Sequence, residues 1–170
     1  HAKAALDSAV QCQMNVKELN DKWSLEKDKW PDLVQTMKMR VGVNTGEMVT
    51  GNMGSLHQMN YTMIGDVVNI ASRLESSAKQ YGIYLHTTEE TLNIAGENNY
   101  YWRFIDRIKF VGKTVPIQTI EIFEFNNEKN DLLLKLIKKF HKGLDYYYKQ
   151  EWDLAIQTFD ECGIYEDQFN

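Results

Sequence analysis

Residues 40–54 read Arg-Val-Gly-Val-Asn-Thr-Gly-Glu-Met-Val-Thr-Gly-Asn-Met-Gly, and this stretch decides the fold. At its start, Met39, Val41 and Val43 alternate with polar residues or glycine, which is the two-residue period of a β-strand. The three residues 45–47 (Thr-Gly-Glu) then predict a turn. A short apolar strand follows and leads into Gly-Asn-Met-Gly, where we expect a hairpin.

A second block, residues 61–75, reads Tyr-Thr-Met-Ile-Gly-Asp-Val-Val-Asn-Ile-Ala-Ser-Arg-Leu-Glu. Its first four residues predict a short strand, and Asp66 can act as the N-cap of a helix that stops at Gly82. One side of that helix is apolar, with residues Val67, Ile70, Ala71, Leu74 and Ala78. Asn69 and Arg73 are four residues apart and are therefore neighbours on the opposite, polar side.

The flanking segments complete an α+β pattern. An apolar stripe predicts a helix over residues 1–30, which ends at Trp30 because the residue before a proline avoids the helical region. The sequence also predicts a short helix that begins with the capping-box pattern of residues 87–90. Further strands are expected at residues 83–86, 100–111 and 118–125.

A polar linker at residues 126–130 predicts a division into residues 1–125 and a C-terminal part, residues 126–170. The second part contains two amphipathic helices, around residues 133–144 and 152–162. Its spacing of a glycine, aromatic residues and Trp-x-x-Ala-x-x-x-Phe resembles one tetratricopeptide-type helix pair. One repeat cannot stack into a solenoid, so an amphipathic hairpin docked on the domain is an equal alternative to a partner-binding module.

Composition excludes several classes of protein. The 170 residues carry 19 Lys+Arg and 24 Asp+Glu, a net charge of −5, and 43% are hydrophobic. Such a chain can bury a core, lacks the basic field of a nucleic-acid protein, and contains no apolar run near the ~20 residues of a membrane helix. The start His1-Ala2-Lys3 suggests a tag remnant or a piece of a longer protein. Cys12 and Cys162 lack metal-ligand spacing and fit a reduced cytosolic compartment.

The blocks Asn-Thr-Gly-Glu (44–47), Gly-Asn-Met-Gly (51–54) and Ile-Gly-Asp-x-Val-Asn-x-Ala-Ser-Arg-Leu-Glu (64–75) occur in register. Together they resemble the catalytic domain of the class III adenylyl/guanylyl cyclases, particularly the bacterial ones. The resemblance spans roughly residues 1–125 and is most specific over residues 40–82. It implies an α+β, ferredoxin-like class III nucleotide cyclase domain that lacks its first strands and is followed by a C-terminal helical hairpin.

By this resemblance, Asn69 and Arg73 match the transition-state residues of the family. Cyclisation is an in-line attack of the ribose 3′-hydroxyl on the α-phosphorus, and a fixed guanidinium can stabilise the charge that develops on the phosphoryl oxygens. An asparagine amide can donate and accept hydrogen bonds, and so can hold the ribose in position. Without the motif, the alternative is a solvated polar face with Arg73 paired to a nearby Glu.

Two further residues match substrate-binding positions of the family. Lys113 matches a turn lysine that reaches the nucleotide phosphates, although the first lysine of that turn is replaced by Val111 here. Thr62 lies where the family reads the purine, and its hydroxyl can accept from the adenine amino group. The alternatives are a solvated turn lysine and an ordinary strand threonine. Thr62 favours ATP over GTP as the substrate.

The family holds two Mg²⁺ or Mn²⁺ ions with a pair of aspartates, and the sequence blocks that carry those aspartates do not occur in this chain. We therefore predict no metal ligands here and no activity of the chain alone. The resemblance implies a homodimer with composite sites. Because the opening strands are missing, we expect apolar faces of the domain to be left uncovered. We expect either an intertwined or otherwise intimate dimer to cover them, or the missing piece of the domain to stay bound non-covalently.

The function expected from the resemblance is an adenylate cyclase that converts ATP to 3′,5′-cyclic AMP and pyrophosphate in intracellular signalling. Guanylate cyclase activity is one alternative. A non-catalytic cyclase-homology domain for dimerisation or regulation is another, but Asn69, Arg73 and Lys113 together favour an enzyme. A ferredoxin-like RNA-binding module is disfavoured by the acidity. We expect a cytoplasmic domain, with no membrane segment in this chain and with a parent protein that can be membrane-anchored.

Overall fold

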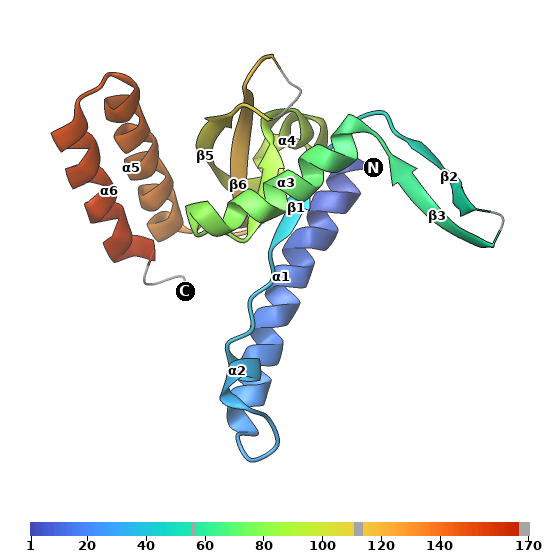
Figure 1. Ribbon diagram of the computed structural model, residues 1–170. Helices are drawn as coiled ribbons and strands as arrows, with labels where there is room; N and C mark the ends of the chain where they lie inside the picture. Colours follow the sequence, from blue (N-terminus) through green and yellow to red (C-terminus); the bar gives the residue numbers. More distant parts are fainter. Residues whose placement is uncertain (56, 111–113, 167–170) are drawn as a thin grey trace.

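The computed structural model describes residues 1–55, 57–110 and 114–166 and shows helices and strands mixed along the chain (Figure 1). The helices are α1 (Ala2–Leu25), α2 (Asp32–Gln35), α3 (Asp66–Tyr81), α4 (Glu89–Ala95), the 3₁₀ turn η1 (Glu97–Asn99), α5 (Asp131–Tyr148) and α6 (Trp152–Glu166). The strands are β1 (Val41–Val43), β2 (Val49–Ser55), β3 (Gln58–Ile64), β4 (Leu85–Thr88), β5 (Tyr100–Ile108) and β6 (Ile117–Phe125). The predicted α+β class is confirmed.

Four strands form the central sheet in the order β1-β4-β6-β5. β1 and β4 run parallel with Val41 opposite Leu85, whereas β6 is antiparallel to both of its neighbours. The side chain of Thr87 adds a hydrogen bond to the Val43 carbonyl oxygen at 2.9 Å. This bond ties the short strand β1 to the middle of the sheet.

The first half of α1 and the helix α4 cover one face of the sheet. Leu6 and Val10 are fully buried there against Leu85 and Ile120. The second half of α1 extends beyond the sheet (Figure 1). The helix ends at Leu25 rather than at the predicted Trp30. The backbone turns there, with the Glu26 N–H donating to the Trp23 carbonyl oxygen at 3.1 Å and the Lys29 N–H donating to the Glu26 carbonyl oxygen at 2.9 Å.

Helix α3 covers the opposite face of the sheet through Ile70, Leu74 and Ala78, as the apolar pattern predicts. It ends at Gly82, whose φ of 69° is the left-handed conformation that glycine adopts without strain. Asp66 is the first residue of the helix, and Gly65 rather than Asp66 occupies the N-cap position. A carboxylate in the first turn still interacts favourably with the helix dipole.

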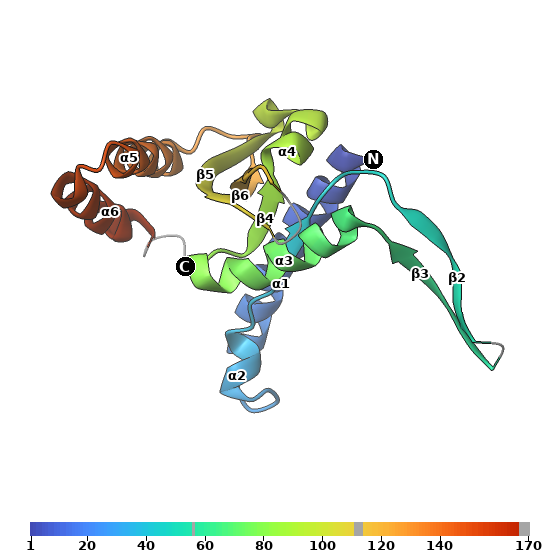
Figure 2. The same ribbon diagram turned by 45° about the horizontal axis from the view of Figure 1, so that its top comes forward.

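Strands β2 and β3 form a separate antiparallel hairpin, which we call the arm, and it projects away from the rest of the protein (Figures 1 and 2). The arm is longer than the sequence predicts, since its strands pair from Val49 opposite Ile64 to Ser55 opposite Gln58. Many of its large apolar side chains face solvent, and Tyr61 is 72% exposed. The other exposed apolar residues of the arm and its base are Met48, Val49, Met59, Met63 and Ile64.

The C-terminal helices α5 and α6 form a hairpin that packs beside β5 (Figures 1 and 2). The two helices approach closely at Gly143, where a Cβ atom would lie 2.7 Å from the ring of Phe159. Leu133 and Leu136 of α5 are buried against Tyr101 of the sheet. No helix in the part of the chain that the structure describes is both long and apolar enough to cross a membrane.

Candidate active site

Helix α3 carries both residues that the sequence analysis assigns to the transition state. Asn69 and Arg73 lie in its first half, directly after the arm strand β3. The burial of Ile70 and Leu74 in the core fixes the rotation of the helix about its axis. Asn69 is exposed and Arg73 is half-buried. The two side chains are one turn apart on a helix that cannot rotate without losing its core contacts.

The start of α3 is anchored to the sheet by Asn44, a residue to which the sequence analysis assigns no role of its own. The Asn44 amide donates to the Val67 carbonyl oxygen at 3.1 Å, and its oxygen accepts from the Thr88 hydroxyl at 3.2 Å. Gly46 lies so close that a Cβ atom there would be 2.3 Å from a Val67 methyl group. The Asn-Thr-Gly block in the sequence marks the position of this anchor. The residues that Asn44 and Gly46 contact are known only from the structure.

Close packing also fixes the middle of α3. A Cβ atom at Gly42 would lie 2.2 Å from the Ala71 carbonyl oxygen and 2.5 Å from the Glu75 nitrogen. The helix therefore rests directly on the backbone of β1. At the edge of this contact, the Arg40 guanidinium lies 3.3 Å from the Glu75 carboxylate.

The two predicted substrate-binding residues do not lie on α3. Thr62 is on the arm strand β3, opposite Gly51 in the register, and its side chain is exposed. It belongs to the same continuous β3–α3 segment as Asn69 and Arg73, separated from the helix by Gly65. Lys113 lies outside the described residues.

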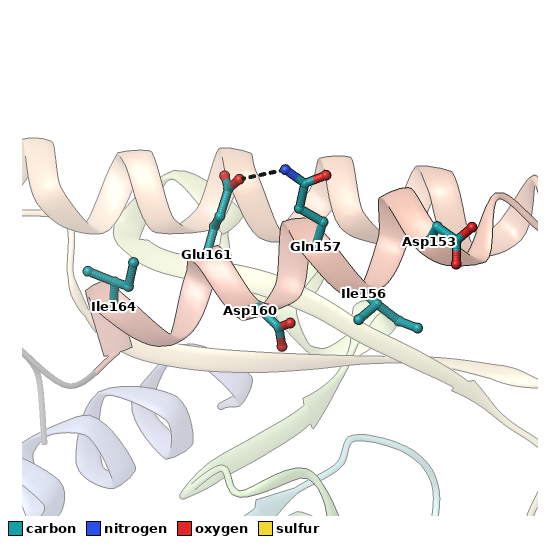
Figure 3. A pocket seen from close by; sticks show the side chains of 6 residues that line it. All are labelled: Asp153, Ile156, Gln157, Asp160, Glu161 and Ile164. Carbon is teal, nitrogen blue, oxygen red and sulfur yellow. Dashed lines mark hydrogen bonds between the residues drawn. The ribbon is translucent and has the colours of Figure 1, made fainter.

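Three hollows of about 410, 300 and 190 Å³ lie away from Thr62, Asn69 and Arg73. All the residues that line the first one come from α6 alone, so it is an open surface rather than an enclosed site (Figure 3). Its lining residues are Asp153, Ile156, Gln157, Asp160, Glu161 and Ile164. Asn69 and Thr62 are exposed in the single chain.

The described residues do not fit a divalent-ion centre. Within residues 1–55, 57–110 and 114–166, no three His, Cys, Asp or Glu side chains gather where they could hold a metal ion. Mg²⁺ and Mn²⁺ need several oxygen ligands close together. No chemical step is therefore assigned to a metal held by this part of the chain.

A second group of ionisable residues, which the sequence analysis missed, is buried between the sheet and the C-terminal hairpin. Arg103 on β5 is 5% exposed, and its Nε donates to the carboxylate of Glu121 on β6 at 2.7 Å. The same guanidinium also pairs with Glu166 of α6. Burial raises the pKa of Glu121 to about 7, and the Arg103 charge opposes this rise only in part.

Glu121→Gln is expected to flatten the pH dependence of stability. The unfolded Glu121 loses its proton near its ordinary pKa of 4.5, whereas the folded one keeps it to about pH 7. Folded protein therefore binds more protons between these values, and this group lowers stability as the pH rises through that window. From pH 5 to pH 8, the free energy of unfolding of the variant should rise by about 2 kcal/mol relative to that of the wild type. Urea unfolding at both pH values measures this difference, and the exposed Glu97→Gln variant serves as the control. If the free energies of unfolding of variant and wild type differ by the same amount at pH 5 and at pH 8, this prediction is contradicted.

Comparison with known proteins gives a consistent result for the first three quarters of the chain. Residues 1–127 match the model of the adenylate and guanylate cyclase catalytic domain family. The terminal-differentiation-specific adenylate cyclase of Dictyostelium discoideum is 30% identical over 125 residues, which are 72% of this chain and 6% of that protein. An adenylate cyclase of Anabaena cylindrica is 32% identical over 120 residues, 69% of this chain and 24% of that protein. The chain spans about a quarter or less of the length of these relatives.

Solved structures show the same likeness. The adenylyl cyclase CyaB from P. aeruginosa superimposes with a TM-score of 0.59 and 26% identity, over 76% of this chain and 62% of that one. The guanylyl cyclase Cya2 gives a TM-score of 0.56 and 25% identity, over 76% of this chain and 61% of that one. One of these two structures is named an adenylyl cyclase and the other a guanylyl cyclase. The structural likeness therefore does not distinguish ATP from GTP as the substrate.

Proposed function

Because the chain belongs to the adenylate and guanylate cyclase catalytic-domain family, we propose that it supplies the transition-state residues of a nucleotide cyclase, Asn69 and Arg73. This proposal rests mainly on one observation: the two side chains lie one turn apart on helix α3, which packs closely against the backbone of β1. The pairing of an amide with a guanidinium suits a reaction that needs both an oriented ribose and a stabilised phosphoryl group.

In the proposed reaction, the ribose 3′-oxygen forms a bond to the α-phosphorus while the bond from that phosphorus to the leaving pyrophosphate breaks. Asn69 orients the ribose, and Arg73 stabilises the negative charge on the phosphoryl oxygens. Lys113 binds the phosphates. The Mg²⁺ or Mn²⁺ ions used by the family would be held by carboxylates outside these 170 residues, so we expect the chain alone to be inactive.

We propose ATP as the substrate because the hydroxyl of Thr62 can accept a hydrogen bond from the adenine amino group. Thr62→Ala should lower the preference for ATP over GTP about tenfold, since a site that hydrogen-bonds a substrate discriminates strongly against one that cannot make the bond. Values of kcat/KM for both nucleotides, determined in an assembly that forms cyclic nucleotide, measure this change. The exposed Thr50→Ala variant, on the neighbouring arm strand, should leave the preference unchanged. An unchanged preference in Thr62→Ala would remove Thr62 from base recognition.

We further propose a homodimer, which can be intertwined, with the active site completed by the neighbouring subunit. Asn69 and Thr62 are exposed in the single chain, and the projecting arm carries apolar side chains that a partner could cover. The same arm also favours the second candidate function, a non-catalytic cyclase-homology domain used for dimerisation. Formation of cyclic nucleotide by an assembly that uses Asn69 and Arg73 distinguishes the two. We place the protein in the cytoplasm, and treat residues 126–170 as a single tetratricopeptide-like unit.

A further inference from the structure

The C-terminal hairpin and helix α3 lie on the same face of the sheet, and the C-terminal end of α3 runs toward α5 and α6 (Figures 1 and 2). Phe140 of α5 packs against the buried cluster of Ala78 from α3 with Ile83 and Ile105. The hairpin therefore contacts the core beneath the second half of α3. The two elements share packing although about fifty residues separate them in sequence.

A row of buried polar side chains crosses three strands between these two elements. Arg103 on β5 and His86 on β4 are both paired in register with Glu121 on the strand between them. Directly paired residues in an antiparallel ladder point to the same face of the sheet. Each of the three is less than 10% exposed. The row therefore lies beneath α3 and the hairpin. Glu121 and His86 are linked in it by the pairing of their strands alone, since no hydrogen bond joins the two side chains and the buried Nε2 of His86 has no hydrogen-bond partner among the described residues.

One end of the row is held by the hairpin. The Arg103 guanidinium pairs with Glu166 of α6, and its centre lies 4.2 Å from the centre of the Phe140 ring of α5. Within the sheet, its Nε is fixed by Glu121. Both helices of the hairpin thus contact the same buried cation. Separating the hairpin from the sheet would leave that cation short of partners, which is costly in a buried position.

The other end of the row is held by α3. The Nδ1 atom of His86 lies 3.0 Å from the Leu74 carbonyl oxygen and 3.2 Å from the Ser77 hydroxyl, both on α3. Burial lowers the pKa of His86, so a neutral ring that donates from Nδ1 to the carbonyl satisfies this geometry. Leu74 is the residue next to Arg73. His86 therefore contacts α3 at the turn that directly follows Arg73.

A second connection joins the same two elements near the surface. The Tyr81 hydroxyl, at the end of α3, donates to the Asp106 carboxylate of β5 at 2.7 Å. The next residue, Arg107, has its guanidinium centre 5.2 Å from the ring centre of Tyr148 on α5. Two connections, one buried and one at the surface, thus link α3 to the hairpin.

We propose that the C-terminal hairpin positions α3, and with it Asn69 and Arg73, through the row Glu166–Arg103–Glu121–His86 and the contact of Tyr81 with Asp106. Displacement of the hairpin, for example by a protein that binds it, would then change the activity of the site. The expected effect of the hairpin on activity rests on the function proposed above. The coupling of the hairpin to α3 does not depend on that function.

The test compares Glu166→Gln with Glu161→Gln in the full chain. Both changes remove one carboxylate from α6, but Glu161 pairs with Lys139 of α5 and so acts only within the hairpin. Hydrogen–deuterium exchange of residues 66–81 should become about two- to tenfold faster in Glu166→Gln. It should stay at the wild-type rate in Glu161→Gln.

A second pair of variants keeps the inference testable if Glu166→Gln does not fold. Tyr148→Leu removes the ring that lies against Arg107, whereas Tyr146→Leu removes a ring that contacts Lys142 within α5. Only the first should accelerate exchange in α3. If exchange rises in α5 and α6 but stays unchanged in α3 for every variant that folds, the hairpin is a passive appendage and the inference is wrong.

Activity separates this inference from the proposed function. In an assembly that forms cyclic nucleotide, Glu166→Gln should lower kcat by a factor similar to the change in exchange, with KM little changed. If α3 responds in the exchange experiment but no assembly with wild-type chain is active, the coupling stands and the proposed function fails. If an active assembly shows the same kcat for wild type and Glu166→Gln, the catalytic part of the inference is overturned.

Discussion

Arg73→Ala is expected to reduce cyclic-nucleotide formation about 100-fold, because it removes the cation that would stabilise the developing phosphoryl charge. The assay combines the chain with a class III cyclase domain that keeps its metal-binding aspartates but has its own Asn and Arg replaced. In this mixture, only the composite site that uses Asn69 and Arg73 can turn over. The loss should fall on kcat, with nucleotide affinity changed far less, since the charge develops in the transition state.

Lys79→Ala is the matched control for this experiment. Lys79 is an exposed cation on the same helix, near its C-terminal end, and its removal changes the charge of α3 by the same amount. It should leave kcat within about twofold of the wild-type value, because an exposed charge distant from the site is strongly screened. A wild-type rate in Arg73→Ala would remove Arg73 from the mechanism.

Gly42→Ala is expected to destabilise the protein strongly. The added methyl group would lie 2.2 Å from the Ala71 carbonyl oxygen and 2.5 Å from the Glu75 nitrogen, and both are backbone atoms that cannot rotate away. Helix α3 would have to move off β1, at a cost of about 3 kcal/mol or more. Urea unfolding followed by circular dichroism measures the change.

Gly51→Ala controls for the general effect of replacing a glycine in a strand. A Cβ atom at this position meets nothing within 4 Å, so the variant should unfold within about 1 kcal/mol of the wild type. Equal stability of Gly42→Ala and Gly51→Ala would mean that α3 does not rest on β1 as described. The positioning of Asn69 and Arg73 would then need another explanation.

Local sequence patterns were sufficient to predict those helices and strands whose apolar side and ends are encoded in their own residues. The apolar side and the Gly82 stop of α3 are encoded within one helix, and the structure confirms both. Errors occur at the boundaries of elements. Helix α1 ends five residues before the predicted Trp30, in a turn closed by the bond from the Glu26 N–H to the Trp23 carbonyl oxygen. The capping box predicted for residues 87–90 is displaced by one residue, since Thr88 accepts from the Thr91 nitrogen.

The candidate site shows the same division. The spacing of Asn69 and Arg73 predicts that they are neighbours on one helix face, and this needs no tertiary information. The anchor at Asn44 and the buried row through Arg103 depend on which strands pair and in which register. Cross-strand register is set by the whole fold, so a single sequence could not reveal that Glu121 faces both Arg103 and His86. The role of Lys113 stays a prediction, because that residue lies outside the described part of the chain.

The most direct test of the proposed division of the site is to measure cyclic-nucleotide formation by the chain alone and in the mixture described above, with ATP and Mn²⁺. We predict no product from the chain alone and none from the Asn- and Arg-deficient domain alone. Product should form when the two are mixed, and Arg73→Ala should abolish most of it. Equal product from the chain alone and from the mixture, or equal rescue by the Arg73→Ala chain, would contradict the account.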